Sequence, residues 1–177
     1  MVRFRKRIIL GILLVFSVGA CACSKRQKEK AFYTGGSEKH ANVTLEAIIA
    51  AAESNNKTAL KDLFSETALE QADDIDMELA AFIEFYQGKM KSYKKQALQS
   101  NQSSGYGEGE KDYLFQVAAL YKVETDQNIY HIRFSENVES KNDKDAGVYR
   151  IGIITDEVFQ TRHNEFGTTD CGLYIIQ

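Results

Sequence analysis

The chain has 177 residues, with 22 lysines and arginines against 25 aspartates and glutamates, a net charge of −3 and no proline. From residue 41 onward the imbalance grows to 13 basic against 23 acidic residues. An acidic surface repels the phosphate backbone, so these numbers exclude nucleic acid as a partner. The length beyond residue 40 suits one domain with its own core.

The N-terminus has the pattern of a secretory signal. Arginines and a lysine precede an apolar run, Ile8 to Ala20, which meets Cys21. Its 13 residues are too few for a bilayer span, which takes about 20, and they fit a signal-peptide core. The sequence Val18-Gly19-Ala20-Cys21 resembles the lipobox of bacterial lipoprotein precursors.

That resemblance implies a signal peptide over residues 1–20 and a lipid, palmitate included, on Cys21. Cys23 is a second candidate acceptor, and an uncleaved short anchor is the other alternative. In each case the remainder is expected outside the cytoplasm, tethered to the cell membrane by its N-terminus. Residues 21–40 are lysine-rich and almost free of apolar side chains, which predicts a disordered stem before a single domain over residues 41–177.

Helices are predicted first. Thr44 is a candidate N-cap for Leu45 to Ser54, and shorter helices are expected from Lys57 to Phe64 and, after Ser65, to Leu69. From Ile75 to Gly88 apolar side chains recur at three and four residues, with Gly88 placed for a left-handed C-terminal residue. We expect the sheet to wrap around this last helix.

Strands follow, because apolar residues then alternate with a period of two. They are predicted at Met90 to Leu98, Asp112 to Glu124, Ile129 to Ser135 and Val148 to Thr155. Residues 101–109 and 137–147 are expected to be loops, and residues 126–128 a hairpin turn. The apolar end, Leu173 to Ile176, is expected to dock on the core.

This order of elements predicts an α+β fold in which N-terminal helices pack in the concavity of a curved antiparallel sheet. The segments Asn56 to Ser65, Phe82 to Gly88 and Gly147 to Ile151 resemble a domain-of-unknown-function family of small Gram-positive lipoproteins. Those proteins resemble the nuclear-transport-factor-2-like superfamily, with its cystatin-like cone. The superfamily includes ketosteroid isomerases, polyketide cyclases and non-enzymatic modules, so the likeness implies a fold and leaves the activity open.

Two functions remain open. The first is a ligand-binding or protein-interaction module for a small molecule or a cell-envelope protein. Its candidate pocket lining is aromatic: Phe82, Tyr86, Tyr113, Phe115, Tyr130 and Tyr149. The alternative is an isomerase-like or cyclase-like enzyme, which needs a carboxylate or histidine in an apolar cavity. His131 alternates away from the apolar face and is a poor base for that role.

Other chemistry has weak support. Ser54 and Lys57, like Ser92 and Lys95, match Ser-x-x-Lys, but the partner motifs Ser-Asp-Asn and Lys-Thr-Gly are missing from the sequence. No metal or cofactor site is predicted, since no set of histidines, cysteines and carboxylates has ligand spacing. A homodimer is conceivable through the outer sheet face, where His131 and Arg133 would lie.

Overall fold

The computed structural model describes residues 36–107, 110–163 and 171–177, so the predicted signal peptide, Cys21, Cys23 and most of the predicted stem lie outside the described residues. The chain divides into two compact units, Met1–Ser37 and Glu38–Gln177, and the second contains the sheet. Its helices are α2 (Ser37–Glu53), α3 (Lys57–Lys61), α4 (Glu66–Gln71), α5 (Ile75–Phe85) and α6 (Asp156–Arg162). Its strands are β1 (Met90–Gly107), β2 (Glu110–Thr125), β3 (Ile129–Ser140), β4 (Gly147–Thr155) and β5 (Gly172–Ile176), with a 3-10 turn, η2 (Asp143–Asp145), between β3 and β4.

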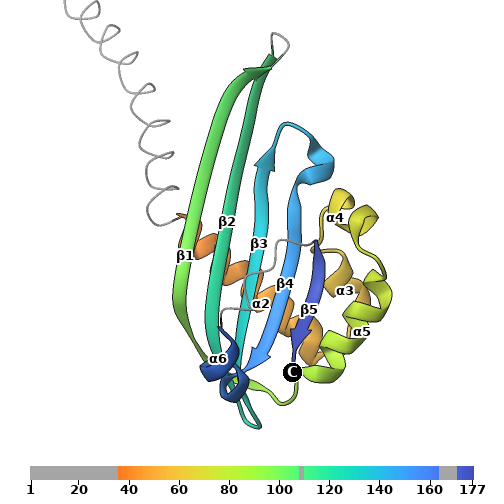
Figure 1. Ribbon diagram of the computed structural model, residues 1–177, viewed down its shortest axis with the longest axis vertical. Helices are drawn as coiled ribbons and strands as arrows, with labels where there is room; N and C mark the ends of the chain where they lie inside the picture. The colour runs from red at the N-terminus through yellow and green to blue at the C-terminus, as the bar shows by residue number, and fades with distance from the viewer. Residues whose placement is uncertain (1–35, 108–109, 164–170) are drawn as a thin grey trace, which may run out of the picture. The chain divides into compact units, whose positions relative to one another are not determined.

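The five strands form one sheet in the order β1-β2-β3-β4-β5, antiparallel except for the parallel pair β4 and β5 (Figure 1). With helices preceding a curved sheet, the predicted α+β class is confirmed. The predicted hairpin at residues 126–128 is confirmed too, because β2 and β3 pair on either side of it.

The helix that crosses the sheet is α2, whereas the sequence pattern had favoured the later helix α5 (Figure 1). One stripe of α2 is buried against the inner sheet face: Ala41, Leu45, Ile48, Ile49, Ala51 and Ala52. Of α5, Leu79 and Phe82 are buried, and this helix packs beside β5 at the sheet edge. The prediction of a central α5 was wrong because periodicity reports an apolar face and not where that face docks.

The start of α2 differs from expectation, whereas its end lies close to the predicted one. The helix begins at Ser37, so the last residues of the predicted stem are helical and Thr44 is not an N-cap. Instead, the Thr44 hydroxyl donates to Glu136 Oε2 at 2.8 Å. After the last turn Asn55 adopts φ +52°, a left-handed conformation that asparagine tolerates better than most residues.

Polar side chains also fix α2 to the sheet. Three of them, four residues apart, each meet one side chain of β1 or β2: Glu38 meets Lys95, Asn42 accepts from the Tyr121 hydroxyl at 2.7 Å, and Glu46 accepts from the Tyr93 hydroxyl at 2.8 Å. Burial raises the pKa of Tyr121 to about 12, so this hydroxyl stays protonated and donates at physiological pH.

The hairpin of β1 and β2 is longer than predicted. Residues 101–107 continue β1, paired with β2 as far as Gly107 opposite Glu110, where a loop had been expected. Serine, asparagine and glycine have low strand propensity, but pairing along β2 supplies the hydrogen bonds that override it. The loop prediction was therefore wrong over most of its length.

Side chains cap the starts of two later helices, and the cap predicted at Ser65 is confirmed. Ser65 caps α4 by accepting from the Ala68 amide, and Asp74 caps α5 by accepting from the Met77 amide. Gly88 is left-handed at φ +91°, but it follows the end of α5 by several residues and turns the chain into β1. A β-carbon there would lie 2.4 Å from Asp126 Oδ1, so glycine is required by both its φ and its packing.

The apolar C-terminus docks as predicted, in the form of strand β5 beside β4. On the outer sheet face a small cluster joins Ile154 and Ile176 to Leu120, Val158 and Phe159. This cluster packs α6 against the sheet, and α6 is a helix that the sequence analysis did not predict. Among the described residues, no helix has both the length and the apolar character needed to cross a bilayer.

Candidate functional site

The six aromatic residues predicted to line a pocket fall into two groups. Four are almost wholly inaccessible, whereas Tyr149 is half-buried and Tyr113 is exposed: the buried four are Phe82, Tyr86, Phe115 and Tyr130. The Tyr86 and Tyr130 rings stack at 5.2 Å between centroids. These rings pack against one another and against the helices, and none of the six lines either of the two open clefts described below.

The hydroxyl groups of the stacked pair have different roles. Tyr130 Oη donates to the Phe85 carbonyl at 3.0 Å and accepts from the Gln87 amide at 2.8 Å, which fixes the end of α5 to β3. Tyr86 Oη is buried beside the Glu53 carboxylate. Burial, followed by the charge of Glu53, raises the pKa of Tyr86, so this tyrosine is not placed as an acid.

His131 lies on the outer face of β3, as its alternation predicts, but it is only 1% exposed because α6 covers it. The Phe159 ring stacks on the imidazole, with centroids 3.6 Å apart. Nε2 lies 2.8 Å from Asp156 Oδ1, and Nδ1 lies 2.6 Å from Gln96 Oε1. Both ring nitrogens are therefore engaged.

Burial and the neighbouring carboxylate act on the pKa of His131 in opposite directions. Burial lowers the pKa of His131, although the Asp156 carboxylate acts in the opposite direction. The pKa of Asp156 is lowered, first by its 2.8 Å hydrogen bond from Lys122 Nζ and then by His131. A neutral His131 donates from Nε2 to the carboxylate, and the Gln96 amide can turn its donor or its acceptor toward Nδ1.

The cluster of His131, Asp156, Lys122 and Gln96 joins four elements, with His131 itself in β3. Lys122 comes from β2, Gln96 from the bulged part of β1, and Asp156 is the first residue of α6. A general base needs one nitrogen free to reach a substrate. Here both nitrogens are occupied and Phe159 covers the ring, so the cluster acts as a latch that holds α6 on the sheet.

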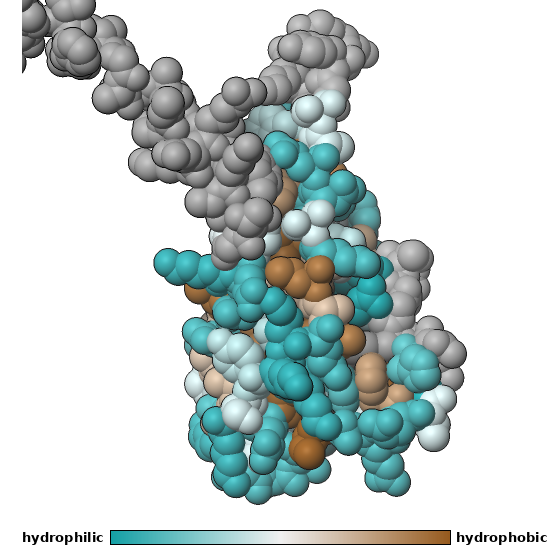
Figure 2. All heavy atoms as spheres, turned by 90° about the vertical axis from the view of Figure 1, so that its left-hand side faces the viewer, coloured by the Kyte–Doolittle hydropathy of each residue, from teal (hydrophilic) through white to brown (hydrophobic). Residues whose placement is uncertain are grey.

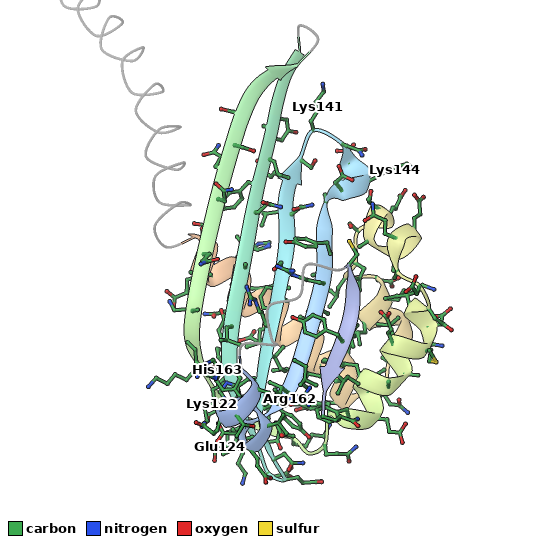
Figure 3. The ribbon with its side chains drawn as sticks, in the orientation of Figure 1. Lys122, Glu124, Lys141, Lys144, Arg162 and His163 are labelled. Carbon is green, nitrogen blue, oxygen red and sulfur yellow. The ribbon has the colours of Figure 1, made fainter. Side chains whose placement is uncertain are left out.

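One open cleft of about 380 Å³ adjoins this latch. It lies between the β2–β3 turn and the start of α6, and four carboxylates line it: Glu124, Asp126, Asp156 and Glu157. Figure 3 shows Lys122, Glu124, Arg162 and His163 at the same end of the sheet. Within the described ranges no three histidines, cysteines or carboxylates are arranged to hold a metal ion.

The other open cleft, of about 550 Å³, lies where the end of α2, the start of α3 and one face of α5 meet. Ala52, Ala80 and Ile83 form its apolar part. Asn55, Lys57 and Glu84 form its polar part. One turn earlier on α5, Met77 is 65% exposed, which extends the apolar surface along that helix.

A second pair of a histidine and a carboxylate, His40 and Glu136, lies on the inner sheet face. His40 Nε2 is 3.0 Å from Glu136 Oε1, and the other oxygen of this carboxylate accepts from Thr44. The hydrogen-bonding and charge of Glu136 raise the pKa of His40, against the opposing effect of burial. Sequence analysis missed this pair, although His40 and Thr44 stand one helical turn apart on what proves to be a single helix.

The chain matches a known family over most of its described residues. A family model described as a domain of unknown function (DUF5104) matches residues 47–156, more than half of the chain. The chain belongs to this family. The DUF5104 match begins inside α2 and ends at the first residue of α6, so it contains β1 to β4 and leaves out β5. No curated protein matched the chain.

The latch could have been only partly anticipated. Thr155 followed by Asp156 and Glu157 is a helix start, and Thr155 Oγ1 does accept from the Val158 amide. That signal predicts a helix, but not that its Phe159 covers His131. The covering requires the β3–β4 register, which places His131 beside Ile154.

Proposed function

We propose that this DUF5104 protein is a lipoprotein of Gram-positive bacteria, anchored to the membrane through Cys21, and that its folded part is an extracytoplasmic binding or interaction module. The anchor is supported by the basic residues, the short apolar run and the lipobox-like sequence before Cys21. The partner of such a module is a small molecule or a protein of the cell envelope.

One observation carries the choice of a surface-acting module. The buried stripe of α2, together with the Tyr86 ring that stacks on Tyr130 of β3, covers the inner sheet face that a substrate cavity would need. The buried His131 has both ring nitrogens engaged. These contacts favour recognition at the surface over the isomerase-like or cyclase-like alternative, which needs a base that faces an apolar cavity.

The anchor is tested by labelling cells that express the full chain with radioactive palmitate. We expect label and membrane fractionation for the unsubstituted chain and for Cys23→Ala, and loss of both for Cys21→Ala, because a lipid on Cys21 is the proposed anchor. Cys23→Ala is the matched control, since it removes a neighbouring thiol. Label that persists in Cys21→Ala and disappears in Cys23→Ala would show that Cys23 carries the lipid. If neither the unsubstituted chain nor the variants were labelled, the proposal of a lipid anchor would be refuted.

The location is tested in the same intact cells with a membrane-impermeant amine reagent. Lys91, Lys94 and Lys141 are exposed in the structure and are expected to react before lysis. Modification only after lysis would contradict an extracytoplasmic module.

A further inference from the structure

β1 is the edge strand of the sheet and the longest strand described, with 18 residues. It pairs with β2 along its whole length, and it has no second strand neighbour among the described residues. An unpaired edge presents backbone donors and acceptors to any strand that approaches. Figure 2 views the molecule from the β1 side and shows a largely hydrophilic surface with a few apolar spots.

The two halves of β1 differ in charge. Lys91, Lys94 and Lys95 lie in the first half, which is also interrupted by register shifts before Ser92 and before Ala97. Lysines and bulges are devices that prevent edge-to-edge pairing. From Ala97 to Gly107 the strand carries no charge and no proline, and its register with β2 is regular.

We propose that the second half of β1 is a self-association edge, which pairs antiparallel with the same segment of a second copy of this chain. The pairing is centred on Asn101, so that each copy's Asn101 faces the other's. The inference goes beyond the proposed function and does not depend on the lipid anchor.

The sequence of this segment complements itself in that register. Ser100 comes opposite Gln102, and Gln99 comes opposite Ser103, so each hydroxyl meets an amide that can donate and accept. Residues 99 to 104 are exposed, so their side chains are accessible to a second copy.

The positions of the lysines in β1 favour the same antiparallel pairing centred on Asn101. An antiparallel pair centred on Asn101 places the lysine-bearing halves of the two copies at opposite ends, far from each other. A parallel pair, or an antiparallel pair centred nearer Lys94, would set like charges side by side, which destabilises a sheet. The second copy therefore fits this edge in one direction and within a narrow range of registers.

The test is oxidative cross-linking of the full chain with a single added cysteine. Residues facing each other across antiparallel strands have Cα atoms about 4.5 to 5.5 Å apart, within reach of a disulfide. We expect Asn101→Cys to form a cross-linked dimer. Ser92→Cys, on the same strand, should not cross-link, because the two copies of residue 92 would be roughly 60 Å apart at about 3.3 Å per residue.

A second pair of variants tests the same edge without a cysteine. Asn101→Lys places two lysines opposite each other and should weaken dimerisation, measured by sedimentation, at least about tenfold. Asn101→Ser, which keeps a neutral polar side chain, should leave it nearly unchanged. The unsubstituted chain, oxidised in parallel, reports cross-linking through the native cysteines.

Three results would overturn the proposal. They are a monomeric full chain in sedimentation, a dimer that Asn101→Lys leaves intact, and cross-linking by Ser92→Cys as efficient as by Asn101→Cys. A partner strand from another protein would give the first of these results.

Discussion

At the scale of single residues, the half-buried His40 and the buried His131 differ in what burial and a nearby carboxylate do to their pKa. Burial and Glu136 oppose each other at His40, and the carboxylate prevails, so the pKa of His40 is raised. At His131 burial prevails over Asp156, and the pKa is lowered. The two groups therefore make contributions of opposite sign to the pH dependence of folding.

The His40 contribution gives a test. The folded chain binds the His40 proton more tightly than the unfolded chain, whose pKa is near the ordinary 6.5. The stabilisation is then complete below that value and is lost as pH rises through the higher pKa of the folded state. We predict that His40→Gln lowers the free energy of unfolding more at about pH 5.5 than at about pH 8.5.

Urea unfolding of both chains at the two pH values measures this difference. Taking the difference between the two chains removes the His131 contribution, which both share. Equal losses at the two pH values would show that His40 and Glu136 do not interact as an ion pair in the folded chain.

At the scale of elements, α6 depends on few contacts. It packs on the sheet through Val158 and Phe159, and its first residue, Asp156, accepts hydrogen bonds from Lys122 and His131. Removing that carboxylate leaves the His131 nitrogen buried without an acceptor. Asp156 is therefore the side chain that joins α6 to the sheet by hydrogen bonds to both Lys122 and His131.

We predict that Asp156→Ala lowers the free energy of unfolding by about 1–3 kcal/mol, the usual effect of leaving a buried polar group without its partner. Glu157→Ala is the matched control, because it removes an adjacent, exposed carboxylate at the same helix end. It should cost only a few tenths of a kcal/mol through the helix dipole. Equal effects in urea unfolding would mean that the latch contributes nothing beyond that dipole.

The elements that the sequence predicted are those with a local signal. Alternating apolar residues predicted β2, β3 and β4, and Ser65 marked the start of α4, which the structure confirms. The second half of β1 was missed because its polar residues form a strand only by pairing with β2. The histidine clusters were missed because each one joins elements far apart in the chain.

At the scale of the whole folded unit, α2 determines whether the inner sheet face is accessible to a ligand. Leu45 and Ile48 are fully buried against the strands, and Asn42 and Thr44 add hydrogen bonds to Tyr121 and Glu136. A helix held by both kinds of contact keeps this face closed. The proposal of a surface-acting module depends on that closure, since a detachable α2 would uncover an apolar face that could receive a ligand.

Hydrogen exchange of the full chain, followed by mass spectrometry, measures this closure directly. We predict that the amides from Leu45 to Ala52 exchange only through global unfolding, with the same opening free energy as the amides of β3. An opening free energy for α2 clearly below that of β3 would contradict the prediction. It would show that the inner face opens in the native protein and would restore the cavity-based alternative.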